Sequence, residues 1–291
     1  MAKNIVVIGA GLGGLTSAAL LAQKGHKVTV LEQGDWIGGK SRRIEVAGQV
    51  IDTGPSLFTF PGVWETFLAK YQELGGKLPK DLEFIRLAEV GRYFFRGDRI
   101  DIPVPESHQW HKPWQKFVAE HKVLEGPITT LLTSAPMDLK ALPALGKLLN
   151  VYGTRLSTNN YLNSLSWMPE GLKDLIAIHT LNAGVSPDQT LPIYASMTAI
   201  MSEQGISVPR GGMNEVPQLL AKLAEESGAE ILLGQRVMSI SKHAVKTQER
   251  NYNADVVVSS LDASLTDALI SGKTAKMAPN RSCSGVAIYA T

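Results

Sequence analysis

The residues with the clearest chemical signature are glycines near the N-terminus, directly after the apolar segment 4–8. Gly9, Gly11 and Gly14 have the spacing GxGxxG. Lacking a Cβ, Gly9 permits a tight turn, Gly11 lets a pyrophosphate approach the backbone, and Gly14 lets a helix pack closely on a sheet. Free N–H groups at the start of that helix attract phosphate. The pattern predicts a dinucleotide-binding turn formed by Gly9, Ala10, Gly11, Leu12, Gly13 and Gly14.

An acidic residue stands at the distance that such a turn requires. Glu32 follows a second apolar segment, residues 27–31, and lies eighteen residues after Gly14. A carboxylate at this place accepts hydrogen bonds from a ribose. A lone GxGxxG motif is a weak indicator, but here strand, turn, helix, strand and acid follow in order. The alternative, a glycine-rich turn without a ligand, is therefore much less favoured.

The elements that position these residues follow from hydrophobic periodicity. In the N-terminal part we predict strands at 4–8 and 27–31, a helix at 15–23, a hairpin at 43–52 and a helix at 63–75. In the middle part we predict strands at 82–87, 92–96 and 99–103, then helices at 114–124, 139–152, 172–181 and 192–201. In the C-terminal part we predict a strand from 206, a helix at 214–227, strands at 229–233 and 254–260, and a hairpin from Val237 with Tyr252 in its return strand.

This change of pattern predicts an α/β fold with a discontinuous domain. Residues 1–80 and 205–291 are expected to form a Rossmann-like dinucleotide-binding domain. Residues 81–204 are expected to form an inserted α+β substrate or cap domain, mostly helical with a hairpin. A chain of 291 residues is long enough for one large domain or two modest ones.

Composition excludes several classes of protein. The net charge is +2, and no Lys/Arg run is dense enough to predict a nucleic-acid partner. Cys283 is the only cysteine, which rules out an internal disulfide and thiolate zinc sites. We see no signal peptide and no stretch of about 18 uninterrupted apolar residues, so a cytoplasmic protein is expected, with any membrane contact peripheral.

Three further segments could hold the rest of an extended ligand. Gly39 and Lys40 belong to a glycine pair followed by a cation, whereas the neighbouring Arg42 and Arg43 are interpreted as a solvated basic loop. The segment 52–55, Asp-Thr-Gly-Pro, is a stiff polar turn; alternatively it is a plain turn that Asp52 stabilises through backbone hydrogen bonds. The third segment comprises 208–213, Val-Pro-Arg-Gly-Gly-Met, and 235–237, Gln-Arg-Val.

Together these segments resemble the phytoene desaturase and carotenoid oxidoreductase family of the FAD-dependent amine-oxidase-like superfamily. The resemblance implies FAD as cofactor, with Gly9, Gly11 and Gly14 around the pyrophosphate and Glu32 on the adenosine ribose. By the same resemblance, Gly39 and Lys40 line the pyrophosphate and ribityl region. It also places Gly54 and Pro55 beside the isoalloxazine ring, and implies that the Val237 backbone bonds the adenine.

The sequence departs from this family in two places. Lys40 stands where arginine is usual, which keeps the positive charge but loses the bidentate fork for phosphate. The family's C-terminal flavin segment is not found, and 284–291 is typical of a strand that simply stops. We therefore expect a truncated chain, with a complementing C-terminal chain as a candidate partner.

The resemblance implies an oxidoreductase, a desaturase that removes hydrogen from an apolar polyene such as a carotenoid precursor. Because such a substrate dissolves in lipid, peripheral contact with the inner face of the membrane is expected. One alternative is an amine- or porphyrinogen-oxidising flavoenzyme of the same superfamily. Another is a non-catalytic fragment or one half of a split enzyme. No catalytic residue can be named, since no nucleophile–base constellation is present.

The remaining candidate residues favour structural roles. His108 and His111 lack a partner pair, so no metal site is expected. His179 is interpreted as a core or rim histidine, and Arg210 is equally compatible with a ligand contact and with a surface cap. Aromatic and methionine side chains of the middle part could line a substrate tunnel, but a core role is favoured for Tyr152, Tyr161, Trp167, Tyr194, Met197 and Met201.

Overall fold

The computed structural model describes residues 1–275 except 79–81, 96 and 136. The strands are β1 Asn4–Ile8, β2 Lys27–Leu31, β3 Arg42–Val46, β4 Gln49–Thr53, β5 Phe84–Leu87, β6 Gly91–Phe95, β7 Asp98–Ile102, β8 Ile206–Pro209, β9 Glu230–Leu232, β10 Val237–Ile240, β11 Ala244–Thr247, β12 Asn251–Asn253 and β13 Val256–Ser259. The α-helices are α1 Leu12–Gln23, α2 Pro61–Glu73, α3 His111–His121, α4 Glu125–Thr133, α5 Leu142–Tyr152, α6 Thr158–Ser164, α7 Glu170–Ala177, α8 Ile193–Gln204, α9 Glu215–Glu226 and α10 Ala263–Ser271. Three short 3₁₀ helices are η1 Lys122–Leu124, η2 Leu139–Ala141 and η3 Ile178–Ala183.

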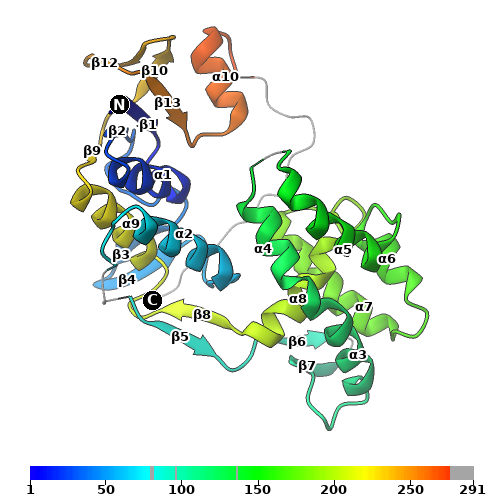
Figure 1. The fold of residues 1–291 in the computed structure, drawn as a ribbon. Helices are drawn as coiled ribbons and strands as arrows, with labels where there is room; N and C mark the ends of the chain where they lie inside the picture. The colour runs from blue at the N-terminus through cyan, green and yellow to red at the C-terminus, as the bar shows by residue number, and fades with distance from the viewer. Residues whose placement is uncertain (79–81, 96, 136, 276–291) are drawn as a thin grey trace.

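A parallel four-stranded sheet carries the N-terminal glycine turn. Its strand order is β13-β1-β2-β9, with Ile5 beside both Val28 and Val256. β1 and β2 are apolar on both faces because α1 and α9 cover one face and the β10–β12 meander packs on the other (Figure 1). The carboxyl ends of β1, β2 and β13 therefore meet at one edge of the sheet, which is the usual ligand-binding edge.

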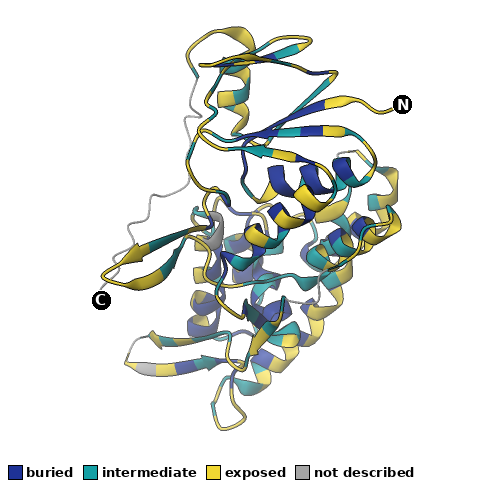
Figure 2. Cartoon of the chain, turned by 90° about the vertical axis from the view of Figure 1, so that its left-hand side faces the viewer, coloured by how far each residue is buried: buried dark blue, intermediate teal, exposed yellow. Residues whose placement is uncertain are grey.

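A second hydrophobic cluster fills the helical middle of the chain. Trp114, Phe117, Leu172 and Ile200 are among its buried members, and the β6–β7 hairpin adds Ile100. Most buried residues lie in these two interiors, one between the sheet and its covering helices and one among the helices of the middle part, and a smaller cluster lies between the sheet and the β10–β12 meander (Figure 2). The mixed α/β architecture with a parallel sheet confirms the predicted fold class.

The two interiors are joined by a short antiparallel pair. β5 pairs with β8 over four residue positions, from Phe84 beside Pro209 to Leu87 beside Ile206. Phe58 extends this pairing by exchanging backbone hydrogen bonds with Ser207. β5 lies in the predicted substrate domain, and β8 lies in the second part of the predicted dinucleotide-binding domain. Their pairing does not test the predicted boundaries at 80/81 and 204/205, which stay predictions.

Several local predictions were wrong. α1 begins at Leu12 rather than Leu15, because Gly11 in extended conformation starts the helix immediately. Tyr252 lies in the third strand of a meander, since β11 intervenes as the direct partner of β10. β13 is half-buried rather than buried because it is the edge strand.

Three helices were not predicted, namely α4, α6 and α10. Their apolar faces are short or interrupted by threonine, asparagine and glycine, so no helical period stands out in the sequence. The predicted strand at 284–291 and Cys283 lie outside the described residues. Within the described part of the chain, no helix is both long and apolar enough to cross a bilayer.

Candidate functional site

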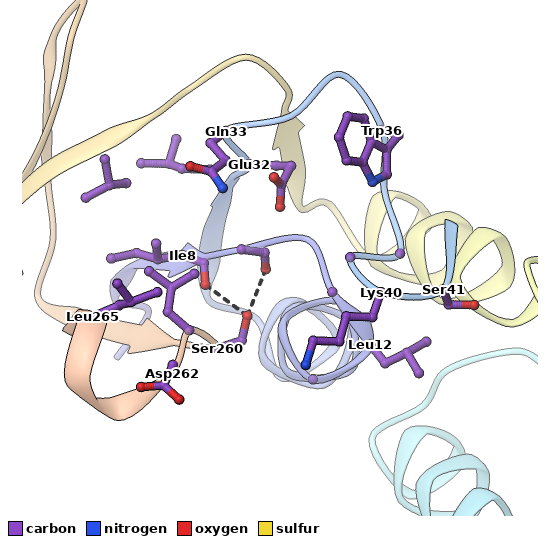
Figure 3. A pocket seen from close by; sticks show the side chains of 18 of the residues that line it. Ile8, Leu12, Glu32, Gln33, Trp36, Lys40, Ser41, Ser260, Asp262 and Leu265 are labelled. Carbon is purple, nitrogen blue, oxygen red and sulfur yellow. Dashed lines mark hydrogen bonds between the residues drawn. The ribbon is translucent and has the colours of Figure 1, made fainter. Parts of the chain in front are cut away.

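An open cavity of about 740 Å³ lies at the carboxyl ends of β1 and β2 (Figure 3). This volume falls in the range of small-molecule and cofactor sites. The cavity is lined by Ile8, Gly9, Gly11, Leu12, Gly13, Leu31, Glu32, Gln33, Trp36, Gly38, Gly39, Lys40, Ser41, Pro55, Gln235, Val237, Ser260, Leu261, Asp262 and Leu265. Of the twelve predicted site residues, all but Ala10, Gly14 and Gly54 line it.

The predicted glycines divide into two kinds. Gly9 has φ +95°, and its N–H donates to the Leu31 carbonyl at 2.9 Å, which closes the turn onto β2. A Cβ on Gly14 would lie 1.9 Å from the Gly9 carbonyl oxygen, so only glycine fits beneath the turn. A Cβ on Gly11 would instead meet nothing within 4 Å. Gly14 thus shapes the turn from below, while Gly11 leaves its upper surface open to the cavity.

The N-terminus of α1 is suited to an anion. Gly11 is its N-cap residue and provides no side-chain cap, and the first turn contains no acidic residue. The first N–H groups of an α-helix lack partners within the helix and carry the positive end of its dipole. Leu12 and Gly13, whose backbone begins the helix, both line the cavity. The arrangement presents donors and partial positive charge to a phosphate.

Glu32 holds the turn together and also faces the cavity. One carboxylate oxygen accepts the Ala10 N–H at 2.8 Å, and the other accepts the Gly34 N–H at 2.8 Å. The Glu32 carbonyl accepts the N–H of Gln235 at 2.7 Å. Each carboxylate oxygen retains a lone pair for a ribose hydroxyl. Ala10 is fully buried and does not line the cavity; its contribution is the backbone N–H that Glu32 accepts.

The second glycine pair closes against the first turn. The Gly38 N–H donates to the Ala10 carbonyl at 2.8 Å. A Cβ on Gly39 would lie 3.1 Å from the Cα of Gly11, and Gly39 has φ +59°, so glycine is favoured at position 39 where the two backbones approach. Lys40 follows directly and extends its ammonium group along the wall of the cavity (Figure 3). It forms no salt bridge with any residue that the structure describes, which leaves its charge for a ligand.

Arg43 contradicts the prediction of a solvated basic loop. Its guanidinium donates to both carboxylate oxygens of Asp52, at 2.6 and 3.2 Å, and to Glu215 at 2.8 Å. It also donates to the Gly211 carbonyl at 2.5 Å. These contacts tie the β3–β4 hairpin to the start of α9. The sequence prediction was wrong because the partners of Arg43 are up to 172 residues away.

Asp52 stabilises a junction between distant segments rather than its own turn. Besides Arg43, it accepts the Asn214 N–H at 3.0 Å. Burial opposes the charged form, but the hydrogen bonds from Arg43 and Asn214 outweigh it and hold the pKa of Asp52 below its usual value. A Cβ on Gly212 would lie 2.2 Å from this carboxylate, which explains a glycine at that position.

The predicted flavin-ring residues lie beside Lys40. Gly54 has φ +107°, and a Cβ there would come within 2.0 Å of the Lys40 carbonyl oxygen. Gly54 therefore permits a close backbone crossing, and Pro55 is the residue of this pair that lines the cavity. Val237 lines the cavity at the start of β10, near Gln235.

Several lining residues were missed by sequence reasoning. The Ser260 hydroxyl bridges the carbonyls of Ile8 and Gly9 at 2.9 and 3.1 Å (Figure 3). Its only sequence signal is its place as the last residue of the predicted strand 254–260. Trp36 was also missed. The Arg42 guanidinium stacks on its ring, 4.0 Å from the ring centroid, and Arg42 is an exposed residue. Asp262 lines the cavity and caps α10, where hydrogen bonds from Ser264 and then the charge of Lys40 lower its pKa.

The other candidates lie elsewhere. Arg210 forms an exposed ion pair with Glu83 at 2.6 Å, which agrees with the surface-cap alternative. His179 is buried and hydrogen-bonded to the Tyr93 hydroxyl at 2.7 Å. Tyr152 and Tyr161 belong to the helical core, in agreement with the core role that the sequence favoured over a substrate tunnel. Among the described residues, no group of histidines, cysteines or carboxylates could hold a metal ion.

The fold and the cavity define an α/β dinucleotide-binding protein, and comparison with known families places it more narrowly. Residues 12–280 match the family described as flavin containing amine oxidoreductase. The match spans most of the sequence, so the chain belongs to this family. The predicted superfamily and its flavin cofactor are thereby confirmed.

The similar curated proteins include carotenoid enzymes. A phytoene dehydrogenase of Streptomyces griseus is 29% identical over 93% of this chain and 56% of its own length. A carotenoid 3,4-desaturase of Haloarcula japonica is 28% identical over 82% of this chain and 51% of its own length. The chain thus spans about half the length of the curated relatives it matches.

Solved structures show the same fold at lower identity. An oxidoreductase from Methanosarcina mazei superposes with a TM-score of 0.63 at 20% identity, covering 92% of this chain and 61% of that one. Cyclohexylamine oxidase from Brevibacterium oxydans superposes with a TM-score of 0.57 at 19% identity, covering 93% and 60%. At these identities the likeness concerns the fold alone.

Proposed function

We propose that this chain binds FAD in the cavity at the carboxyl ends of β1 and β2. One observation carries the proposal: the cavity unites a glycine turn, an open helix N-terminus, an acid and an unpaired cation. Gly11 and Gly13 would lie beside the pyrophosphate, and Lys40 would add its positive charge. Glu32 would accept hydrogen bonds from the adenosine ribose.

The remaining predicted residues would hold the two ends of the cofactor. Gly39 would line the region where the ribityl chain leaves the pyrophosphate, and Gly54 and Pro55 would lie beside the isoalloxazine ring. The backbone of Val237 would bond the adenine. These roles follow from the family resemblance, and the lining of the cavity supports them for Gly39, Pro55 and Val237.

We further propose that the complete enzyme is a desaturase acting on an apolar polyene such as a carotenoid precursor. The similar curated proteins named phytoene dehydrogenase and carotenoid desaturase support this substrate class over amines or porphyrinogens. A bound flavin would supply the acceptor for the hydrogen whose removal from the substrate leaves the new C=C bond. The chain's own contribution is to orient the cofactor and to keep its phosphates neutralised.

Two partners follow from this proposal. A polyene partitions into lipid, so the enzyme would meet its substrate at the inner face of the membrane. The relatives are about twice as long, and we propose that a complementing polypeptide supplies the residues needed for full activity.

The substitution Gly11→Trp tests the cofactor site. Gly11 has φ −74° and open space at its Cβ, so the variant should fold. The indole would occupy the place of the pyrophosphate, and FAD binding should be lost. The measurement is quenching of flavin fluorescence on titration with protein. Gly126→Trp is the matched control, since Gly126 is exposed and its Cβ would also meet nothing within 4 Å.

The results separate the cofactor from the substrate. Normal flavin binding by folded Gly11→Trp protein would contradict the placement of the pyrophosphate. If the wild-type chain binds FAD, product analysis of the complemented enzyme with phytoene and with an amine panel decides the substrate. Turnover of an amine without turnover of phytoene would overturn the desaturase proposal and leave the flavin site intact.

A further inference from the structure

Helix α5 is apolar on two sides. Leu148 and Tyr152 are buried against the helical core. On another side, Leu142, Leu145 and Leu149 are 57%, 45% and 56% exposed. Their spacing of three and four residues places them on one stripe of the helix. A helix at the surface of a globular protein needs one apolar face, so this stripe requires a separate explanation.

Further exposed leucines occur on elements next to α5. Leu139 in η2 is 76% exposed, Leu132 near the end of α4 is 59% exposed, and Leu156 after α5 is 80% exposed. Both α4 and η2 pack directly against α5. Isolated exposed leucines are ordinary, but a concentration of them marks an interaction surface. We call it the α5 apolar surface; its members are Leu132, Leu139, Leu142, Leu145, Leu149 and Leu156.

The charges around this surface are mainly positive. Lys140, Lys147 and Arg155 are exposed, and Asp138 is the single acid between residues 134 and 156. One oxygen of the Asp138 carboxylate accepts the backbone N–H of Lys140 at 2.9 Å. Neither Lys140 nor Lys147 forms a salt bridge with a described residue. Leucines flanked by unpaired cations complement a lipid surface with anionic headgroups, whereas the cores of protein–protein interfaces are depleted of lysine.

We propose that the α5 apolar surface docks this protein on an anionic bilayer. The leucines would enter the boundary between headgroups and acyl chains, and the lysines would contact the headgroup phosphates. The proposal rests on the proposed function in one respect, because a lipid-dissolved substrate gives the docking its purpose. It uses none of the residues of the flavin cavity.

Vesicle sedimentation tests the proposal. The protein should cosediment with vesicles of phosphatidylcholine and phosphatidylglycerol, and more weakly with phosphatidylcholine alone. The triple variant L142S/L145S/L149S should lose most of this binding, and K140E/K147E should lose the preference for anionic lipid. The matched control V50S/M238S/I270S removes apolar side chains that are 64%, 48% and 59% exposed elsewhere. It should sediment like the wild type.

Three outcomes would overturn the proposal. The first is that the wild type does not bind anionic vesicles. The second is that the L142S/L145S/L149S variant binds them as well as the wild type. The third is that the V50S/M238S/I270S control loses as much vesicle binding as the L142S/L145S/L149S variant. Gel filtration accompanies each assay, and a wild-type dimer that the variant dissociates, without lipid binding, would assign the surface to a second copy. Flavin titration is read separately, so failure of the FAD site and failure of lipid docking are distinguishable.

Discussion

At the scale of single residues, the glycines between positions 9 and 14 have different physical roles although they belong to one sequence motif. Gly9 and Gly14 are required by backbone geometry, since a Cβ at either would strike atoms of the turn or of Ser260. Gly11 and Gly13 face the cavity; a Cβ on Gly11 would meet nothing within 4 Å, and one on Gly13 would only touch the Ser260 Cβ at 4.0 Å. Substitutions at the first pair should damage the fold, whereas Gly11→Trp should damage ligand binding alone.

Lys40 provides a test of electrostatics at the same scale. Lys40→Met removes an unpaired cation from the cavity wall, and we expect FAD affinity to fall about tenfold, as for the loss of one partly exposed charge-assisted contact. Lys40→Arg should bind at least as well as the wild type, since the guanidinium offers a fork to phosphate. Fluorescence titration at low and high salt measures both effects.

The control for this prediction is Lys246→Met, which removes an exposed cation from the middle strand of the meander. It should leave FAD affinity unchanged. Salt should weaken wild-type binding more than Lys40→Met binding, because screening acts on the charge that the variant lacks. An unchanged affinity in Lys40→Met would remove Lys40 from the proposed phosphate contacts.

At the scale of elements, Arg43 connects segments that the sequence keeps far apart. It joins the β3–β4 hairpin to the Gly211–Gly212 turn and to the first residue of α9. α9 packs on α1, whose N-terminus forms the floor of the cavity. Asn214 adds a second link, because its side-chain amide donates to the Ser41 carbonyl at 2.7 Å. The Lys40 segment is thus held between the hairpin and α9.

Removal of the Arg43 guanidinium should therefore destabilise the protein. Arg43→Met leaves the half-buried Asp52 and Glu215 without their cation, and we expect the free energy of unfolding to fall by about 1–3 kcal/mol. Urea unfolding followed by circular dichroism gives this difference. The adjacent Arg42→Met removes an exposed guanidinium and should cost much less. Equal midpoints for the two variants would show that the Arg43 contacts contribute no net stability.

At the scale of the whole molecule, the helical interior contains a buried polar network. His121 is fully buried, its Nδ1 lies 2.7 Å from the Phe117 carbonyl, and its Nε2 lies 2.8 Å from the Tyr161 hydroxyl. The Phe117 carbonyl can only accept, so Nδ1 donates to it; because burial disfavours the charged ring, Nε2 of the neutral ring accepts from the Tyr161 hydroxyl. Tyr152 is hydrogen-bonded to Ser196 close by. Burial of the ring lowers the pKa of His121 from 6.5 to about 4.

This network makes global stability depend on pH. Between pH 6.5 and about 4 the unfolded chain binds a proton at His121 that the folded chain does not. The free energy of unfolding therefore falls as pH decreases through this window, by an amount of the order of 3 kcal/mol at the lower end. Burial also lowers the pKa of His179, so this residue too reduces the free energy of unfolding as pH decreases.

Urea midpoints at pH 7.5 and pH 5 measure this dependence. His121→Gln removes the titrating group, so its midpoint should fall less between the two pH values than that of the wild type, whatever its absolute stability. His243→Gln, an exposed substitution, should reproduce the wild-type difference. An identical pH response in His121→Gln and wild type would contradict a neutral buried ring.

The sequence by itself determined the local parts of this protein. β1, the glycine turn, β2 and Glu32 are specified by hydrophobic period, glycine spacing and the position of one acid, all within 32 residues. The α9 helix and the β3–β4 hairpin were equally accessible, because amphipathic period and a Gly48 turn act over short distances. Five of the nine predicted site residues that line the cavity, namely Gly9, Gly11, Leu12, Gly13 and Glu32, belong to this local unit, whereas the other four were predicted from the family resemblance.

Only the tertiary structure decided which distant groups meet. The Arg43–Glu215 contact, the placing of Ser260 under the glycine turn and the pairing of β5 with β8 join residues separated by more than a hundred positions. No periodicity encodes such pairings, since they depend on how whole elements pack. The same holds for the α5 apolar surface: the leucines are visible in the sequence, but only packing decides that Leu148 is buried while Leu149 remains exposed.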